Sequence, residues 1–469
     1  MIGANRSVAI IGGGIAGMSA AFALREQFPD LAITLFEARR ATGGRAGSFI
    51  DSMSGDQVDY CQHVAMGCCT NLLAMMKQAG IDDAFTRFES LTFHHPKFPA
   101  VRFEKSSLLP APMHLLPSLL RMPYLSWRQR FDVGRATFKL MRLRENSLKN
   151  TTALNWLTSN GQSAATIRDY WDVVIASALG ESSERVSMAA TRKVFIDGFL
   201  AHRDASDVLV PRLPLSELFG ERLPGALKAV GVDVRSGTAV QSLAIDDQSK
   251  ASLGVKGATI AFDHVIVAVP YFALNKIIDE NTARRAGLPL DRYAGVASSP
   301  ISGIHLWFDQ PVIEAPHAVL VNSLAQWLFR RESDTAGTGL HYVQVVVSAS
   351  HALRLRDSEQ VIEQVVGEIK HAFPQSSRAT LVRGRVVTDP QSVFSITPEV
   401  DAMRPTSHTA LPCLHLAGDF VQTGWPATME GATISGRMAA SSVAEQLGGT
   451  PVVVDSGLPR NLLCRMLVR

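Results

Sequence analysis

The sequence predicts an α/β protein that opens with a parallel βαβ unit, and three observations carry this prediction. An apolar run over 8–11 enters a glycine-rich turn, and an alanine-rich helical segment follows it. A second apolar run, over 32–36, ends at the carboxylate of Glu37. Strand-like apolar runs return between 231 and 269 and again at 414–416, with long segments of helical spacing between them. The chain therefore leaves its first sheet and comes back to it.

The opening unit has the spacing of a dinucleotide-binding fold. Gly12, Gly14 and Gly17 form a Gly-x-Gly-x-x-Gly pattern, and Glu37 follows twenty residues later. The first glycine permits a tight turn, the second lets the backbone approach a pyrophosphate, and the third allows close packing of helix and strand. The free N–H groups of the helix start point at the phosphates, while Glu37 accepts hydrogen bonds from a ribose. We expect this turn to bind the dinucleotide through Gly12, Gly14, Ile15, Ala16 and Gly17.

The residues after Glu37 indicate which dinucleotide is bound. Glu37-Ala38-Arg39 leads through a short loop to Gly43-Gly44-Arg45, an arrangement that resembles the extended fingerprint of the FAD-dependent amine oxidase and phytoene desaturase superfamily. The resemblance implies non-covalent FAD in a GR2-type Rossmann-like domain with an inserted mixed helical and sheet substrate domain. Paired glycines allow the backbone to pass close to the cofactor, and Arg45 adds a cation beside the pyrophosphate.

Two segments near the end of the chain agree with this resemblance. The apolar run over 414–416 leads to Gly418-Asp419, and in flavoproteins of this kind such a pair contacts the ribityl-pyrophosphate part of FAD. Asp419 alternatively serves only as a helix cap. The helix that starts at Ala427-Thr428-Met429 directs its N-terminus at the pyrimidine side of the flavin, where it stabilises the negative charge of the reduced ring. By the same resemblance, the backbone near Val240 lies beside the adenine.

A narrower resemblance rests on Gln62-His63 with Gly67 and, most specifically, on the Thr-Gly-Trp-Pro-Ala-Thr-Met-Glu stretch at 423–430. Both resemble the squalene-associated flavoproteins called hydroxysqualene dehydroxylases, bacterial relatives of phytoene desaturase. The likeness runs from residue 8 to about residue 445. Cys61 departs from it, because the family usually shows a glycine before the Gln-His pair.

The resemblance implies an activity and a set of catalytic candidates. The reaction would remove the allylic hydroxyl of hydroxysqualene, a C30 isoprenoid, to give squalene by hydride transfer from reduced flavin in squalene and hopanoid formation. Gln62, His63 and Trp425 are the candidates beside the flavin. His63 either donates a proton or orients the cofactor. Trp425 either lines the substrate channel or packs beneath the flavin. A carotenoid-type desaturase or an amine oxidase would share every FAD motif, and a non-catalytic flavoprotein scaffold is a further alternative.

Composition and cysteine spacing limit the classes of partner, compartment and metal site that we expect. A net charge of +3 over 469 residues does not indicate a nucleic-acid binder. The five cysteines form no disulfide framework, which indicates a reducing, cytoplasmic compartment. Cys61, His63, Cys68 and Cys69 lack the spacing of a metal site, so we expect no metal.

The segments are assigned to two domains. The FAD-binding domain is expected over 1–70, 206–290 and 405–447, and the substrate-binding domain over 71–205 and 291–404, with a tail at 448–469. The pattern over 71–205 reads as mainly helical, and His94-His95 reads as a loop rather than a site. Alternating apolar runs between 300 and 350 predict a sheet.

One segment has an unusual composition for a protein surface. Residues 106–120 contain no charge, and 121–149 hold eight basic residues against Asp132 and Glu145. This favours either a membrane-surface patch, with Tyr124 and Trp127 at the interface, or a buried helical hairpin with a solvated basic face. A lipid substrate favours the first. We then expect peripheral contact with the inner face of the cytoplasmic membrane and association with enzymes of the squalene and hopanoid pathway.

Overall fold

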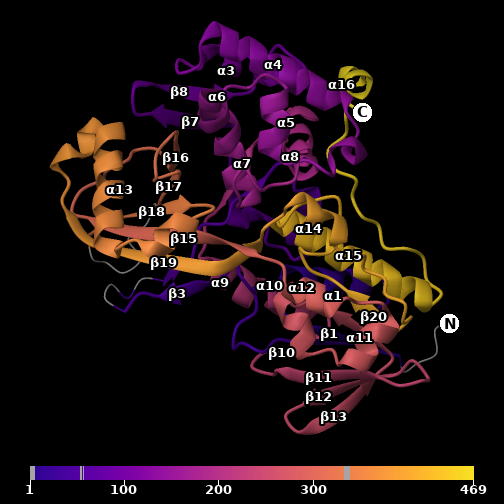
Figure 1. Ribbon diagram of the computed structural model, residues 1–469. Helices are drawn as coiled ribbons and strands as arrows, with labels where there is room; N and C mark the ends of the chain where they lie inside the picture. Colours follow the sequence, from indigo (N-terminus) through magenta and orange to yellow (C-terminus); the bar gives the residue numbers. More distant parts are fainter. Residues whose placement is uncertain (1–5, 53–54, 56, 332–338) are drawn as a thin grey trace.

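A parallel five-stranded sheet at the lower right of Figure 1 draws its strands from three distant parts of the chain. The computed structural model describes residues 6–52, 55, 57–331 and 339–469, so residues 1–5, 53–54 and 56 of the predicted 1–70 segment and 332–338 of the 291–404 segment lie outside it. All pairings in this sheet are parallel. Its strands, in spatial order, are β10 (Asp233–Arg235), β2 (Ala32–Phe36), β1 (Ser7–Ile11), β14 (His264–Val267) and β20 (Leu414–Leu416).

Two helices from opposite ends of the chain pack against each other on this sheet. They are α1 (Ile15–Gln27) and α15 (Met429–Gln446). A Cβ on Gly436 would lie 2.2 Å from the carbonyl oxygen of Ala16, so the crossing requires glycine at this position. The Ser19 hydroxyl donates to the carbonyl of Thr433 at 2.8 Å. Small residues in both helices therefore bring the N-terminal part of α1 into close contact with the first half of α15 (Figure 1).

The described part of the chain also forms three smaller sheets. The antiparallel strands β11 (Val240–Ile245), β12 (Ala251–Val255) and β13 (Ala258–Phe262) lie below the parallel sheet in Figure 1. A hairpin pairs β3 (Ser48–Ile50) with β4 (Gln57–Asp59). A third sheet has the order β5 (Ala65–Met66), β9 (Val208–Pro211) and β6 (Phe85–Phe88).

A seven-stranded sheet on the left of Figure 1 joins two segments of the predicted substrate domain. The predicted strands near 304–308 and 342–347 are confirmed as β15 (Ser298–Phe308) and β18 (His341–Val347). The expected loop at His94-His95 was wrong, because both residues end strand β7, whose Phe93 and His94 pair with Val319 and Leu320 of β16. The other strands are β19 (Leu381–Phe394), β17 (Trp327–Arg330), β16 (His317–Leu320), β7 (Ser90–His95) and β8 (Phe98–Glu104), and α13 (Ser358–Ala372) packs on this sheet.

Residues 106–205 form the helical upper part of the molecule (Figure 1). The prediction of helices over 71–205 missed the strands between 85 and 104. Strands β7 and β8 form a local hairpin, whereas β6 and the other edge of β7 pair with strands more than a hundred residues later. No helix among the described residues is long and apolar enough to cross a membrane. The helices of 71–205 are α2 (Thr70–Gln78), α3 (Leu116–Arg121), α4 (Trp127–Arg142), α5 (Ala153–Ser159), α6 (Ala164–Thr166), α7 (Asp172–Leu179) and α8 (Met188–Phe195). Those of the rest are α9 (Leu215–Glu217), α10 (Leu223–Ala229), α11 (Glu280–Ala286), α12 (Leu290–Ala294), α14 (Pro398–Met403) and α16 (Leu462–Leu467).

Candidate functional site

The carboxyl ends of β1, β14 and β20 meet around the glycine turn. A Cβ on Gly12, whose φ is +115°, would lie 2.5 Å from the carbonyl oxygen of Ala268. A Cβ on Gly17 would lie 2.0 Å from the carbonyl oxygen of Gly12. Both glycines are therefore required by the packing of the protein itself. In open parallel sheets, ligands bind outside this edge of the strands.

Gly14 stands in contrast to these two glycines. A Cβ built on Gly14 meets nothing within 4 Å, so the chain leaves space beside this residue. Helix α1 starts directly after it, with no side-chain cap and no acidic residue in its first turn. The N–H groups of Ile15 and Ala16 at this helix start provide a positive end for an anion. The space and the donors fit the pyrophosphate of a dinucleotide.

The carboxylate of Glu37 is held firmly beside the turn. Its two oxygens accept hydrogen bonds from the backbone N–H groups of Gly13 and Arg39, both at 2.8 Å. Ala38, between Glu37 and Arg39, is exposed. The Thr238 N–H donates to the Glu37 carbonyl at 2.8 Å, and β11 begins two residues later at Val240. Glu37 and Val240, the residues predicted to contact the ribose and the adenine, therefore lie at the same edge of the site.

The predicted Gly43-Gly44-Arg45 loop lies directly on the glycine turn. Gly43 donates its N–H to the carbonyl of Gly13 at 2.8 Å, and a Cβ on Gly44 would approach the Gly14 Cα to 3.3 Å. The guanidinium of Arg45 forms an ion pair with Asp419 at 2.6 Å. Two residues predicted separately as cofactor contacts, almost four hundred positions apart, are thus side by side.

The start of α15 completes this arrangement. The Thr428 hydroxyl accepts from the N–H of Gly431 at 3.0 Å and caps the helix, with Ala427 and Met429 half-buried on either side. Gly418, with φ at +134°, donates its N–H to the hydroxyl of Ser435 at 2.8 Å. The hydrogen bond fixes the Gly418-Asp419 turn against the helix.

Glu430 has a role that the sequence interpretation missed. Its buried carboxylate accepts from the backbone N–H groups of Asn71 and Leu72 at 3.1 and 2.9 Å, and from the Asn71 side chain at 2.8 Å. Burial raises the pKa of Glu430. The residue therefore caps α2 from the first turn of α15. No short motif connects residues so far apart in the sequence.

Arg404 was also missed, and it organises the loop after β20. Its guanidinium is 2% exposed and donates to the carbonyls of Val421 and Trp425, both at 2.7 Å, and of Asp419 at 3.2 Å. Asp401 balances its charge at 3.3 Å. One buried cation thus holds the chain that carries two predicted site residues, Asp419 and Trp425.

Replacing Arg404 by methionine should destabilise the protein by about 3 kcal/mol, because several buried carbonyls and the Asp401 carboxylate lose their donor. FAD affinity should also fall, since the Asp419 turn loses its support. Lysine should rescue only part of the loss, because an ammonium cannot reproduce the fork of a guanidinium. Thermal unfolding and FAD titration of both variants provide the measurement. Unfolding of R404M at the wild-type temperature would contradict this role.

The imidazole ring of His63 is hydrogen-bonded to the backbone of its own loop. Its Nδ1 is 2.9 Å from the carbonyl of Cys61, so Nδ1 carries the hydrogen. Burial lowers the pKa of His63, which makes the imidazole neutral at neutral pH with Nε2 as an acceptor. Burial also raises the pKa of the Cys61 thiol to about 12, so that thiol stays protonated. The Gln62 amide points back to the His63 carbonyl at 3.4 Å.

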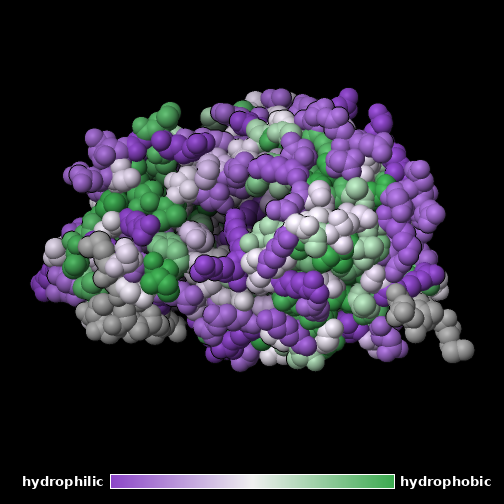
Figure 2. All heavy atoms as spheres, turned by 90° about the horizontal axis from the view of Figure 1, so that it is seen from below, coloured by the Kyte–Doolittle hydropathy of each residue, from purple (hydrophilic) through white to green (hydrophobic). Residues whose placement is uncertain are grey.

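Trp425 is half-buried, and the ammonium of Lys193 lies 4.7 Å from the centre of its ring. The cation stacks on the aromatic face and holds the ring against helix α8. Viewed from below, the molecule is hollowed between the part that carries the seven-stranded sheet and the part that carries the parallel sheet (Figure 2). Hydrophilic side chains line much of this hollow (Figure 2).

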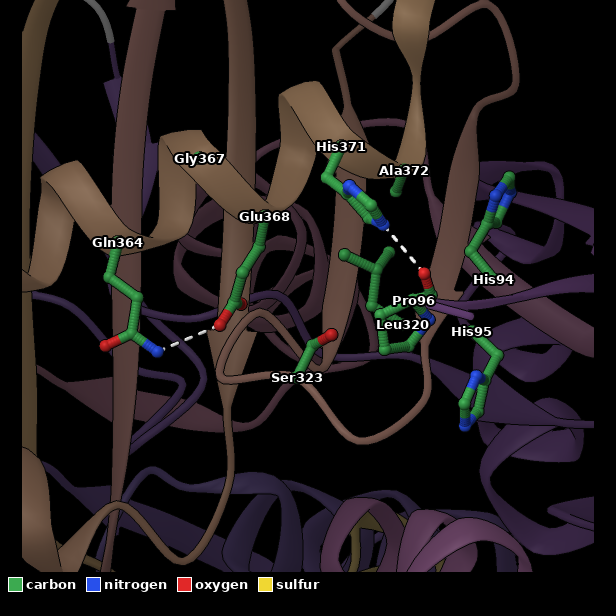
Figure 3. Close-up of a pocket in the computed structure, with 10 residues that line it drawn as sticks. All are labelled: His94, His95, Pro96, Leu320, Ser323, Gln364, Gly367, Glu368, His371 and Ala372. Carbon is green, nitrogen blue, oxygen red and sulfur yellow. Dashed lines mark hydrogen bonds between the residues drawn. The ribbon is translucent and has the colours of Figure 1, made fainter. Parts of the chain in front are cut away.

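A separate pocket of about 410 Å³ lies between α13 and the ends of β7 and β16 (Figure 3). His94 and His95 line it together with His371, whose Nε2 contacts the Pro96 carbonyl at 2.7 Å. No predicted cofactor or catalytic residue lines this pocket. Within the described part of the chain, no group of three histidine, cysteine or acidic side chains is placed to hold a metal ion.

The fold and the site define a dinucleotide-binding flavoprotein. The chain belongs to the flavin containing amine oxidoreductase family, whose model matches residues 15–444. It is therefore an FAD-dependent oxidoreductase.

Curated relatives match the chain along nearly its full length. It is 23% identical over 459 residues to 15-cis-phytoene desaturase from Synechococcus elongatus, covering 93% of this chain and 95% of the relative. It is 24% identical over 485 residues to zeta-carotene desaturase from Synechocystis sp., covering 93% and 96%.

Solved structures show the same fold at lower identity. Cyclohexylamine oxidase from Brevibacterium oxydans superposes with a TM-score of 0.67 at 17% identity, covering 95% of this chain and all of the other. An oxidoreductase from Methanosarcina mazei gives a TM-score of 0.68 at 16% identity, covering 92% and 98%.

Proposed function

We propose that this chain exchanges hydride between its FAD and a carbon atom of a long isoprenoid. The observation that carries the proposal is the similarity, over 93% of the chain, to desaturases named for phytoene and zeta-carotene. Bound FAD would supply a hydride acceptor or donor at its ring. Gly14, Glu37, Arg45, Asp419 and Thr428 would hold it, because they surround the glycine turn and the starts of α1 and α15.

Desaturation is the direction that the curated relatives support. The substrate would lose a hydride to FAD and a proton from the neighbouring carbon, leaving a carbon–carbon double bond. That proton needs an acceptor. Neutral His63 offers Nε2 for this task, since its Nδ1–H is engaged by the Cys61 carbonyl.

Reductive dehydroxylation of hydroxysqualene is the second candidate, and the stretch at 423–430 favours it. Here a proton would reach the allylic hydroxyl, water would leave, and the carbon would receive a hydride from reduced FAD. If His63 supplied the proton it would first have to be protonated, against the lowered pKa that burial gives it. The reaction through His63 would therefore accelerate as pH falls, whereas a desaturation that uses neutral His63 would accelerate as pH rises.

An anaerobic test separates the two directions. Oxidised holoprotein is mixed with phytoene, and reduced holoprotein with hydroxysqualene, both in detergent micelles, while flavin absorbance and product mass are followed. We expect one arm to change the flavin and release the matching product. The isoprenoid proposal fails if both arms stay silent, as a scaffold requires, or if the flavin responds only to a primary amine.

A variant of His63 tests the proton step. H63Q should retain FAD, slow hydride transfer by at least about tenfold and lose the pH dependence of the wild type. Gln62→Asn in the same loop is the matched control and should keep that dependence. An unchanged pH profile in H63Q would remove His63 from the reaction.

A further inference from the structure

Most of the strongly exposed large apolar side chains belong to two segments of the chain. Ten of them are more than half exposed in the described part of the chain, and six of the ten belong to two segments, 108–138 and 462–466. These six side chains, named here the apical face, are Leu108, Trp127, Phe131, Phe138, Leu462 and Met466. Soluble proteins usually scatter such side chains singly, so their concentration needs a cause.

Helix α4 is apolar on two opposite sides. Its inner side buries Val133, Ala136 and Leu140 in the core. Its outer side presents Trp127 and Phe131, 72% and 71% exposed and one turn apart, with Phe138 two turns further on. A surface helix needs only the inner stripe to fold, and its outer side is ordinarily polar. The outer aromatic row is therefore not needed to pack the inner side of α4 into the core.

The end of the chain extends this face. Helix α16 lies beside the C-terminal end of α4 along the upper edge of the molecule (Figure 1), where Arg142 donates to the carbonyl of Met466 at 3.0 Å and the Arg469 N–H donates to that of Met141 at 2.9 Å. Cys464 anchors α16 in the core with no exposed surface, while Leu462 and Met466, one turn apart, are 76% and 66% exposed. The tail thus adds a second outward apolar row.

Cations accompany the aromatic row. Arg128 and Arg135 are exposed, with 93% and 58% of their side chains accessible, and they share Asp132, the one acidic residue of α4, at 3.9 and 3.6 Å. The guanidinium of Arg130 lies 4.5 Å from the centre of the Trp127 ring. The outer side of α4 therefore combines exposed aromatics with an excess of positive charge.

We propose that the apical face docks on the surface of an anionic lipid bilayer, with α4 and α16 lying in the headgroup region. Aromatic rings and leucines would enter the boundary of the acyl chains, while the arginines would meet lipid phosphates. A lipid surface satisfies both the apolar and the cationic character. A second copy of this chain would instead set rows of arginines against each other. The inference does not depend on which isoprenoid the enzyme converts.

Vesicle co-sedimentation of the full-length holoprotein tests this surface without any turnover. The probe is phosphatidylcholine vesicles with and without phosphatidylglycerol. We expect binding to anionic vesicles and at least about tenfold weaker binding to neutral ones. W127S/F131S should lose at least about tenfold in affinity for the anionic vesicles, and L462S/M466S should lose affinity as well. FAD content and melting temperature should stay at wild-type values because these side chains are exposed.

Matched controls come from another part of the surface. Leu355 and Val382 are 93% and 55% exposed and lie outside the apical face, so L355S/V382S should bind vesicles as the wild type does. R128Q/R135Q should weaken binding to anionic vesicles, whereas exposed Arg354→Gln should not. Equal binding by all variants would overturn the proposal. So would a wild-type dimer that ignores vesicles and dissociates in W127S/F131S, since the face would then join two copies. Failure of the isoprenoid assay would leave vesicle binding unaffected.

Discussion

Gly14→Leu is expected to abolish FAD binding while the apoprotein stays folded. A side chain at this position enters space that no protein atom occupies within 4 Å of a Cβ, at the start of α1. That space is where the pyrophosphate must approach the helix N–H groups. We expect FAD affinity to fall by about two orders of magnitude or more, equivalent to about 3 kcal/mol. FAD titration and thermal unfolding of the apoprotein measure the two properties separately.

Gly17→Ala is the matched control, and it should behave in the opposite way. Its Cβ would lie 2.0 Å from the carbonyl oxygen of Gly12, so the strand and helix must separate even without cofactor. The apoprotein of this variant should melt at a lower temperature. If Gly14→Leu also lowered the apoprotein melting temperature, the space beside Gly14 would belong to the fold rather than to FAD.

Glu430→Ala is expected to destabilise the protein by about 3 kcal/mol, because three buried donors lose their acceptor at once. The donors are the N–H groups of Asn71 and Leu72 and the Asn71 amide, all at the start of α2. Thermal or denaturant unfolding of the apoprotein measures this effect.

Two further variants define the role of Glu430. Glu430→Gln should lie between wild type and alanine, because one amide oxygen still accepts while its NH₂ group faces another donor. Glu445→Ala, an exposed position on the same helix α15, should leave stability within about 0.5 kcal/mol of wild type. Equal losses of stability in the Glu430→Ala and Glu445→Ala variants would show that the carboxylate of Glu430 does not cap α2.

Local spacing was sufficient to predict the parallel strands and the glycine turn. The residues 8–11 and 33–36 are buried on both faces of the sheet, so apart from Thr34 they carry a continuous apolar pattern. The requirement for Gly17 is likewise local, because its Cβ would meet the backbone of Gly12, whereas the requirement for Gly12 comes from Ala268 on a distant strand; the Gly-x-Gly-x-x-Gly spacing nevertheless marks both glycines. Such features can be recognised within a short window of sequence.

The residues that the sequence interpretation missed act instead on parts of the chain that lie outside any short sequence window. Arg404 acts on carbonyls 15 to 21 residues away, and Glu430 acts on α2 almost 360 residues earlier. Strand β7 pairs with β8 in a local hairpin, where His95 lies opposite Phe98, and also with β16, more than two hundred residues later. Only the first of these pairings lies within a short window of sequence. These roles follow from tertiary contacts, which leave no spacing pattern in the chain.

The ion pair between Arg45 and Asp419 has a consequence for how the protein is made. The glycine turn is synthesised long before the strand that precedes Asp419 and before helix α15. Domains that close through such distant contacts complete late. The nascent chain consequently lacks a finished cofactor site until Asp419 and helix α15 have left the ribosome, and FAD can be captured tightly only after that point. Chains truncated before Asp419 would therefore lack tightly bound cofactor.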